Sequence, residues 1–221
     1  MSLLDLASKR QSPRAFDGSA LTWDDLADGF EAARLSSSSY NNQPWRFVVA
    51  LRGEAGFEAL LQTAVEANQT WMKDAGAIVG VMASTVLEKT GETDHAALLG
   101  VGMAVGAMEL AFTEAGLASM QAGGFDRAAF RELLGLPDHL RAVSLLAVGR
   151  VPEGHVPGAK ARKSLSDIAF RVGFRKLLSL PDHIVAVSLL AVGRLPEGHA
   201  APAKARKSLS DIAFRVGDDI R

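Results

Sequence analysis

The chain has 221 residues, a formal net charge of -1 and 48% hydrophobic residues, a profile typical of a soluble globular protein with one sizeable core. Because positive and negative charges nearly balance, the chain has no overall positive field. We therefore expect neither nucleic acid nor a membrane surface as a partner. The sequence holds no cysteine. This excludes disulfides, thiolate nucleophiles and cysteine zinc sites, and it fits a reducing cytoplasm.

Helical and strand patterns alternate along the chain. Apolar spacing predicts helices over residues 2–9, 23–34, 53–67 and 96–117, and Thr22 is predicted as the N-cap of the second. Apolar and β-branched runs predict strands over 45–51, 77–83 and 142–148. The 96–117 segment comes nearest to a membrane span, but its glycines and its glutamates favour a buried helix. Helices that separate strands predict an α+β or α/β domain.

A basic cluster lies just after the first predicted helix. Arg10 and Arg14 place two guanidinium groups on either side of the Ser12 hydroxyl, and Pro13 favours an extended backbone between them. These donors suit a phosphate group. A solvated basic loop is the alternative interpretation.

A second polar segment, residues 36–47, reads SSSSYNNQPWRF. Its small polar side chains would let hydrogen-bonding groups approach the edge of a flat heteroaromatic ring such as a flavin. The alternative, a flexible serine linker, fits poorly with the packed strand that directly follows Pro44.

These two segments resemble motifs of the FMN-dependent nitroreductase family. Three later segments resemble further motifs of that family in the expected order: NQTWMKDA at 68–75, the glycine-rich stretch at 116–126, and Lys160-Ala161-Arg162. The resemblance spans residues 1 to about 173. It implies an α/β sandwich, with a central, mainly antiparallel sheet flanked by helices, in an intertwined homodimer.

The resemblance also implies the FMN-binding residues. One group would hold the phosphate and ribityl chain: Arg10, Gln11, Ser12, Arg14, Lys160 and Arg162. A second group would lie along the ring and its N5 atom: Asn68, Gly123 and Gly124. A third would come from the other subunit: Ser38, Ser39 and Asn41. The chain departs from the family pattern at Ser37, where proline is common, and at Trp71, where some members carry lysine.

The last part of the chain is an internal repeat. Residues 130–173 recur at 174–217 without a gap and with about eight differences. Two units are too few for a solenoid, so we interpret the repeat as a tandem duplication. We expect one FMN-binding domain, 1–173, followed by a near-identical duplicate with a short tail, 174–221, that is not an independent domain.

The duplication creates two alternatives for the C-terminal part of the site. Lys204 and Arg206 repeat Lys160 and Arg162. The first pair is favoured, because the second requires the residues between to be looped out. The duplicate of the third strand, at 186–192, would extend the sheet, exchange between subunits or promote higher assembly.

The function implied by the resemblance is that of an FMN-dependent oxidoreductase. It would pass hydride from NAD(P)H through flavin N5 to a small-molecule electron acceptor: a nitroaromatic, a quinone or an activated alkene. No Gly-x-Gly-x-x-Gly loop follows a predicted strand, so NAD(P)H would bind only transiently. No catalytic side chain and no metal site are predicted, since the histidines lack a convergent ligand set. The alternative is a flavin-storage or regulatory protein of the same fold with lost or altered activity.

Overall fold

The computed structural model describes residues 1–169, 187–188, 190–195, 197–199 and 203–218. The chain divides into two compact units. The main unit comprises Met1–Pro157 and Lys204–Arg221, and the second unit comprises Gly158–Ala203. The domain boundary expected at residue 173 lies outside the described residues, so the expected domain limits stay a prediction.

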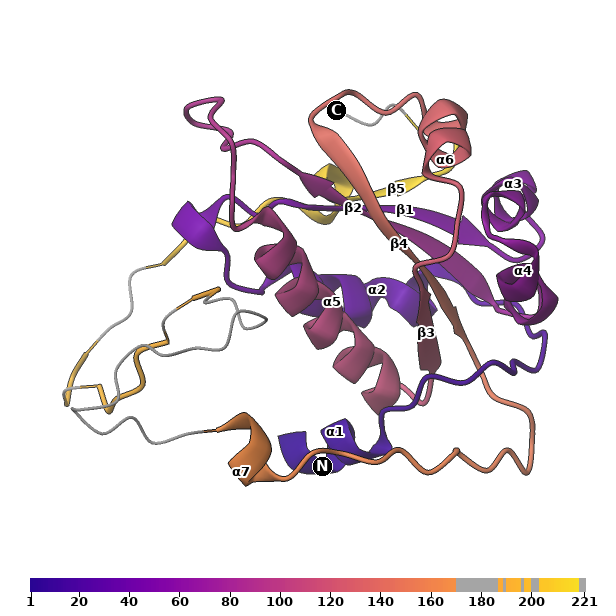
Figure 1. The fold of residues 1–221 in the computed structure, drawn as a ribbon, viewed down its shortest axis with the longest axis horizontal. Coiled ribbons are helices and arrows are strands. Elements are labelled where there is room, and N and C mark those ends of the chain that lie inside the picture. Colours follow the sequence, from indigo (N-terminus) through magenta and orange to yellow (C-terminus); the bar gives the residue numbers. More distant parts are fainter. Residues whose placement is uncertain (170–186, 189, 196, 200–202, 219–221) are drawn as a thin grey trace. The chain divides into compact units, whose positions relative to one another are not determined.

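A mixed sheet forms the centre of the main unit, and its five described strands have the order β3-β4-β2-β1-β5 (Figure 1). Their bounds are β1 Trp45–Leu51, β2 Ala77–Ser84, β3 Ala118–Ala122, β4 Leu140–Gly149 and β5 Ala213–Arg215. Every neighbouring pair is antiparallel except β1 and β5, which are parallel. The mainly antiparallel sheet and its three predicted strands are therefore confirmed, whereas β3 and β5 were not predicted.

Helices cover both faces of this sheet (Figure 1). One face packs against α2 (Trp23–Arg34) and α5 (Ala97–Glu114), and α1 (Leu3–Lys9) lies beside α5. The opposite face packs against α3 (Ala55–Thr63), α4 (Glu66–Met72) and α6 (Arg127–Leu134).

Strand β1 shows why the sequence forms this three-layer arrangement. Successive side chains of a strand point to opposite faces. Phe47 and Val49 accordingly belong to the core beneath α2 and α5, while Val48 and Ala50 belong to the core on the other face. Because both faces are covered, the strand is apolar nearly throughout, which is why the sequence signal was clear.

Helix α5 is long and apolar enough, by length and composition alone, to cross a membrane, with a mean hydropathy of 1.4. In the structure it packs against α2 and the sheet, and Val101, Val105, Met108 and Phe112 are buried. The contacts are those of a core helix. The other side of α5 is solvent-exposed at several apolar positions.

The prediction of a single helix over residues 53–67 is wrong. Ala64 and Val65 have extended backbones, with ψ of 149° at each, and they separate α3 from α4. The Val65 N–H donates to the Gly124 carbonyl (3.1 Å), and Ala64 bridges to Phe125. These contacts with the segment after β3 outweigh the local helical spacing.

The main unit takes its C-terminal elements from both copies of the repeat. Strand β4 and the last five residues of helix α6 belong to the first copy, whereas β5 belongs to the second copy. The residues between them, Gly158–Ala203, belong to the separate second unit. Which of the two basic pairs completes the phosphate site stays a prediction.

The prediction of a surplus strand at 186–192 is wrong for those of its residues that the structure describes. Residues 187–188 and 190–192 are not in a strand, and Val187, Leu190 and Val192 are exposed. The rest of this segment lies outside the described residues. Strand β4 already lies between β2 and β3, so its duplicate cannot take the same position in the sheet.

Candidate functional site

The basic cluster follows α1 as an extended segment. Arg10 Nη1 donates to Ser12 Oγ at 2.9 Å, and both residues are partly buried. The Gln11 side-chain oxygen lies 3.2 Å from a ring nitrogen of His155, in the turn after β4. Arg14 is exposed. The structure therefore brings Arg10 and Ser12 together as expected and adds His155, which the sequence did not single out.

A second group of expected site residues meets at the end of β3. Asn68, on α4, donates from Nδ2 to the Gly124 carbonyl at 2.9 Å. A Cβ atom at Gly124 would lie 3.0 Å from that amide nitrogen, so any side chain there would require Asn68 to shift. At Gly123 a Cβ would meet nothing within 4 Å. This leaves open space next to the Asn68–Gly124 contact.

An aromatic contact links these two groups. Phe16, which ends the basic segment, packs against Trp71 of α4 with ring centroids 6.4 Å apart. Both rings are buried. Trp71 Nε1 is buried without a hydrogen-bond partner among the described residues. A buried N–H donor usually finds a partner, so this region has hydrogen-bonding capacity that the chain does not use.

The serine-rich loop is ordered by its own hydrogen bonds. Ser38 Oγ accepts from the Gln43 backbone N–H (2.9 Å), and Asn42 Nδ2 donates to Asp94 (2.8 Å). Tyr40, Asn41 and Gln43 have positive φ values of 52°, 56° and 50°. Such conformations cost energy in non-glycine residues and persist only where surrounding contacts impose them. The loop is therefore not a flexible linker.

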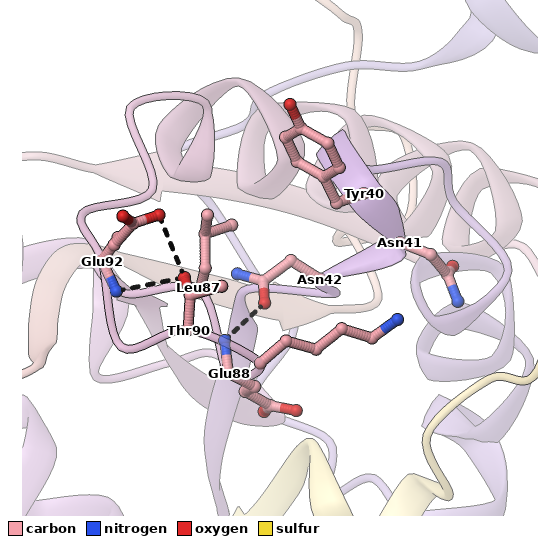
Figure 2. Close-up of a pocket in the computed structure, with 8 residues that line it drawn as sticks. Tyr40, Asn41, Asn42, Leu87, Glu88, Thr90 and Glu92 are labelled. Carbon is pink, nitrogen blue, oxygen red and sulfur yellow. Dashed lines mark hydrogen bonds between the residues drawn. The ribbon is translucent and has the colours of Figure 1, made fainter.

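A pocket of about 410 Å³ lies beside this loop. Figure 2 shows Asn42 reaching toward the turn after β2, where its Oδ1 accepts from the Glu88 N–H at 3.0 Å. The lining residues are Tyr40, Asn41, Asn42, Leu87, Glu88, Lys89, Thr90 and Glu92. The volume is within the usual range of ligand pockets. The 87–92 side of the pocket was not predicted from the sequence, where the turn residues Lys89-Thr90-Gly91-Glu92 are its only signal.

The second copy of the repeat docks on the serine-rich loop. Asn41 donates to the Ala205 carbonyl (2.8 Å) and accepts from Arg206 Nη1 (2.6 Å). Gln43 Oε1 accepts from the Lys207 N–H at 2.7 Å. Arg206, the duplicate of Arg162, thus contacts one of the expected flavin-binding residues.

Three charged side chains stabilise this contact. Arg46 is buried, donates to the carbonyls of Gln43 (3.0 Å) and Trp45 (2.8 Å), and pairs with Glu88 (3.0 Å). Glu88 also pairs with Lys207. Burial lowers the pKa of Arg46 and of Lys207. Burial raises the pKa of Glu88, but Lys207 and Arg46 oppose this, so that the pKa lies below its usual value.

The expected site residues are therefore distributed over three places. Arg10 and Ser12 lie in the segment that ends at Phe16, whereas Asn68 lies on α4 with Trp71 and contacts Gly124. Ser38, Ser39 and Asn41 lie in the serine-rich loop, beside the first half of α5, where a Cβ at Gly100 would be 3.6 Å from Ser38. Lys160 and Arg162 lie in the second unit. Among the described residues, no group of three or more histidine, aspartate or glutamate side chains is placed to hold a metal ion.

Comparison with known proteins identifies solved structures with the same fold. A solved structure of an oxidoreductase containing FMN is 26% identical, with a TM-score of 0.72, and the match covers 79% of this chain and 93% of that one. A nitroreductase family protein from Clostridium difficile is also 26% identical, with a TM-score of 0.64, covering 80% of this chain and all of the other. A Desulfovibrio desulfuricans protein solved in complex with FMN shares the fold, with 21% identity, a TM-score of 0.64, and 79% and 98% of the two chains covered.

A sequence relative from Streptococcus pyogenes carries the name NAD(P)H nitroreductase. It is 31% identical over 87 residues, which is 39% of this chain and 42% of that relative. The chain thus matches less than half of the relative's length. The family model described as Nitroreductase family matches residues 7–150, which is most of the chain and includes both the basic segment and the serine-rich loop. The chain belongs to the nitroreductase family.

Proposed function

We propose that the protein is an oxidoreductase that binds FMN. The observation that carries this proposal is the contact between Phe16 and Trp71. It joins the basic segment to α4, where Asn68 contacts Gly124 and the Trp71 indole N–H is unused. These are the donors that a phosphate and a flavin ring require. The related oxidoreductase whose structure contains FMN supports the same cofactor.

The residues present fit this cofactor at both of its ends. Arg10 and Ser12 are already hydrogen-bonded to each other, which fixes two donors for the phosphate. The open space at Gly123 leaves room for a ring next to the amide of Asn68. FMN would supply the hydride chemistry, while the chain supplies binding and orientation.

We further propose that the complete site needs two chains. Ser38, Ser39 and Asn41 are in a different part of the main unit from Arg10 and Asn68, next to α5. The outer side of α5 exposes Leu98, Leu99 and Met103, and a Cβ at Gly102 or Gly106 would meet nothing within 4 Å. Apolar side chains together with open glycines suit close packing of a second helix. A homodimer would then bring the serine-rich loop of one chain to the basic segment of the other.

NAD(P)H is the proposed reductant, in line with the name of the Streptococcus pyogenes relative. The proposed acceptor is a small oxidised molecule such as a nitroaromatic, a quinone or an activated alkene. A cytoplasmic location is proposed because the sequence has no cysteine.

A visible spectrum of the purified protein with added FMN tests the proposal. We expect the flavin absorbance to stay with the protein through gel filtration and to bleach when NADH or NADPH is added without oxygen. A protein that takes up no flavin would refute the proposal. A protein that binds FMN but is reduced by neither nucleotide would instead be the flavin-storage or regulatory member of the fold.

The substitution Arg10→Ala tests the phosphate group with a matched control. Losing a charge-assisted hydrogen bond to the cofactor weakens binding by roughly 10- to 100-fold. Lys9→Ala removes the adjacent, exposed cation and should leave the FMN dissociation constant unchanged. Equal effects of the two substitutions would indicate a general charge effect and not a phosphate site.

A second pair of variants tests which basic pair completes that site. Lys160→Ala with Arg162→Ala, compared with Lys204→Ala with Arg206→Ala, should differ in FMN retention. The sequence favours the first pair, whereas the bond between Arg206 and Asn41 supports the second. Loss of flavin in only one of the two double variants identifies the pair.

A further inference from the structure

The basic segment, residues 10–16, has no regular secondary structure, so its contacts with the rest of the main unit determine its conformation. Its end is fixed to the end of β4. Phe16 packs on Gly149, where a Cβ atom would lie 2.8 Å from the ring, and the Asp17 N–H donates to the Arg150 carbonyl at 3.0 Å. The expected phosphate donors, however, lie nearer the beginning of the segment.

His155 holds this beginning. Its ring nitrogen Nε2 lies 3.2 Å from Oε1 of Gln11, and both side chains are partly buried. An amide oxygen can only accept a hydrogen bond, so Nε2 is the donor. A neutral ring with its hydrogen on Nε2 and a protonated ring can both make this bond. The contact therefore does not depend on the charge of the imidazole.

Gln11 lies between the two expected phosphate donors in the sequence. Successive side chains of an extended chain point in different directions. Arg10 bonds to Ser12, two residues further on, whereas Gln11 bonds to His155. Anchoring Gln11 thus restricts the backbone that carries Arg10 and Ser12, while it takes up none of their hydrogen-bond donors. Donors that are fixed before a ligand arrives lose less entropy when the ligand binds.

The repeat provides a second example of the turn that carries this histidine. Residues 152–155 and 196–199 both read PEGH, and the glycine of each has a φ of 75°. His199 is exposed, whereas His155 bonds to Gln11. The turn thus has the same glycine conformation around an exposed histidine as around a bonded one. We therefore expect the turn to stay intact when the His155 ring is removed.

We propose that His155 is a positioning residue for the phosphate end of the bound flavin. It acts through Gln11. By holding this side chain, it keeps the basic segment in the conformation that presents Arg10 and Ser12 to a phosphate group. In this role His155 contacts Gln11 and not the cofactor. The role rests on the proposed binding of FMN.

Dissociation constants for FMN and riboflavin, measured by flavin fluorescence, test this role. Riboflavin has the same ring and ribityl chain but no phosphate. His155→Ala removes one hydrogen bond, which should weaken FMN binding by roughly 3- to 10-fold and leave riboflavin binding unchanged. His199→Ala, at the matching position of the second copy, is the control and should change neither constant. Equal weakening of FMN and riboflavin binding would overturn the role, because it would indicate a general loss of structure.

A conservative variant and a double-mutant cycle show whether His155 acts through Gln11. His155→Gln keeps a side-chain N–H that can donate to Gln11, so it should restore most of the FMN affinity. Gln11→Ala removes the other partner of the bond. The variant with both His155→Ala and Gln11→Ala should bind FMN no more weakly than Gln11→Ala alone, because the two residues share one contact. Additive losses would overturn the proposal, since His155 would then act independently of Gln11.

The binding measurements also separate this role from the proposed function. If the unsubstituted chain took up no FMN, the proposed function would be refuted, and the role of His155 with it. If the unsubstituted chain and His155→Ala bound FMN equally well, only the role of His155 would be refuted. His155→Asn, whose amide is too short to reach Gln11, replaces the alanine variant if circular dichroism shows that the latter does not fold.

Discussion

The segments 164–168 and 208–212 have the same sequence and the same serine–aspartate capping bonds, but the first forms an α-helical turn, the second forms a 3-10 turn, and their surroundings differ. Ile168 is 61% exposed in the second unit, whereas Ile212 is 0% exposed in the main unit. In each, the serine side chain and the aspartate three residues later cap a short helical turn. Local sequence therefore determines the turn, and contacts distant in the chain determine its burial.

The largest expected contrast comes from truncating the two isoleucines. Ile212→Ala removes a fully buried side chain and should lower the free energy of unfolding by about 2–4 kcal/mol. Ile168→Ala should change it by less than about 0.5 kcal/mol. Urea denaturation followed by circular dichroism measures both. Equal losses would mean that the two segments share one environment in solution.

Acid should release the docked segment selectively. The pKa of Glu88 lies below its usual value of 4.5 in the structure, because Lys207 and Arg46 favour the ionised form against the opposing effect of burial. Asp211 is shifted in the same direction, chiefly by the Ser208 hydroxyl. Docking is therefore most stable above that usual value and weakens as the pH falls through the lowered pKa.

A fluorescent label at Ala205→Cys, compared with one at Ala161→Cys, measures this release. The anisotropy at position 205 should drop between about pH 5 and pH 3, while that at position 161 stays constant. Far-ultraviolet circular dichroism over the same range shows whether the main unit remains folded. A simultaneous change in both labels would point to global unfolding.

Glu88→Gln should weaken docking by about 1 kcal/mol, since Glu88 is half-exposed and solvent screens its ion pairs. The neutral amide still accepts hydrogen bonds but no longer balances the partly buried charges of Arg46 and Lys207. Glu92→Gln, in the same turn, is the control and should have no effect. Anisotropy at Ala205→Cys in both backgrounds provides the comparison.

The smallest expected contrast concerns the N-terminal halves of the two repeats. Gly135 ends α6 with a φ of 56°, and its counterpart in the second copy is Ser179. Gly135→Ser places a side chain in the left-handed region and should cost about 1 kcal/mol of unfolding free energy. Arg141→Val, another repeat difference at an exposed position of β4, should cost almost nothing. If Gly135→Ser left the free energy of unfolding unchanged, the left-handed conformation at position 135 would not explain why the first copy supplies this part of the main unit.

Much of the fold was predictable because it depends on local patterns. The apolar run Trp45–Leu51 gave β1 with its observed bounds, and Thr22 caps α2 as expected. The break between α3 and α4 was not predictable, because it depends on the pairing of Val65 with Gly124, which is distant in the sequence. Strand β5 has three residues and no strand pattern, and only its partner β1 defines it.

The candidate site was predictable only in part. The family resemblance implied Arg10, Ser12, Asn68 and Gly124, and the structure shows contacts between Arg10 and Ser12 and between Asn68 and Gly124. Their role in binding FMN stays a prediction. The Arg46–Glu88–Lys207 cluster had no sequence signal, because its members come from three separate segments. The choice between the two copies also had none, because residues 160–173 and 204–217 have the same sequence.

The main unit uses the N-terminal half of the first copy and the C-terminal part of the second copy, and this has a consequence for the gene. Recombination between the two stretches that encode KARKSLSDIAFRVG would delete about 44 residues and yield the same shorter chain wherever within them the crossover fell. That chain would keep every residue type that the main unit now uses, from the basic segment to the docked tail. The duplication is thus reversible in a single genetic event, until a substitution in one tail makes the two copies distinguishable.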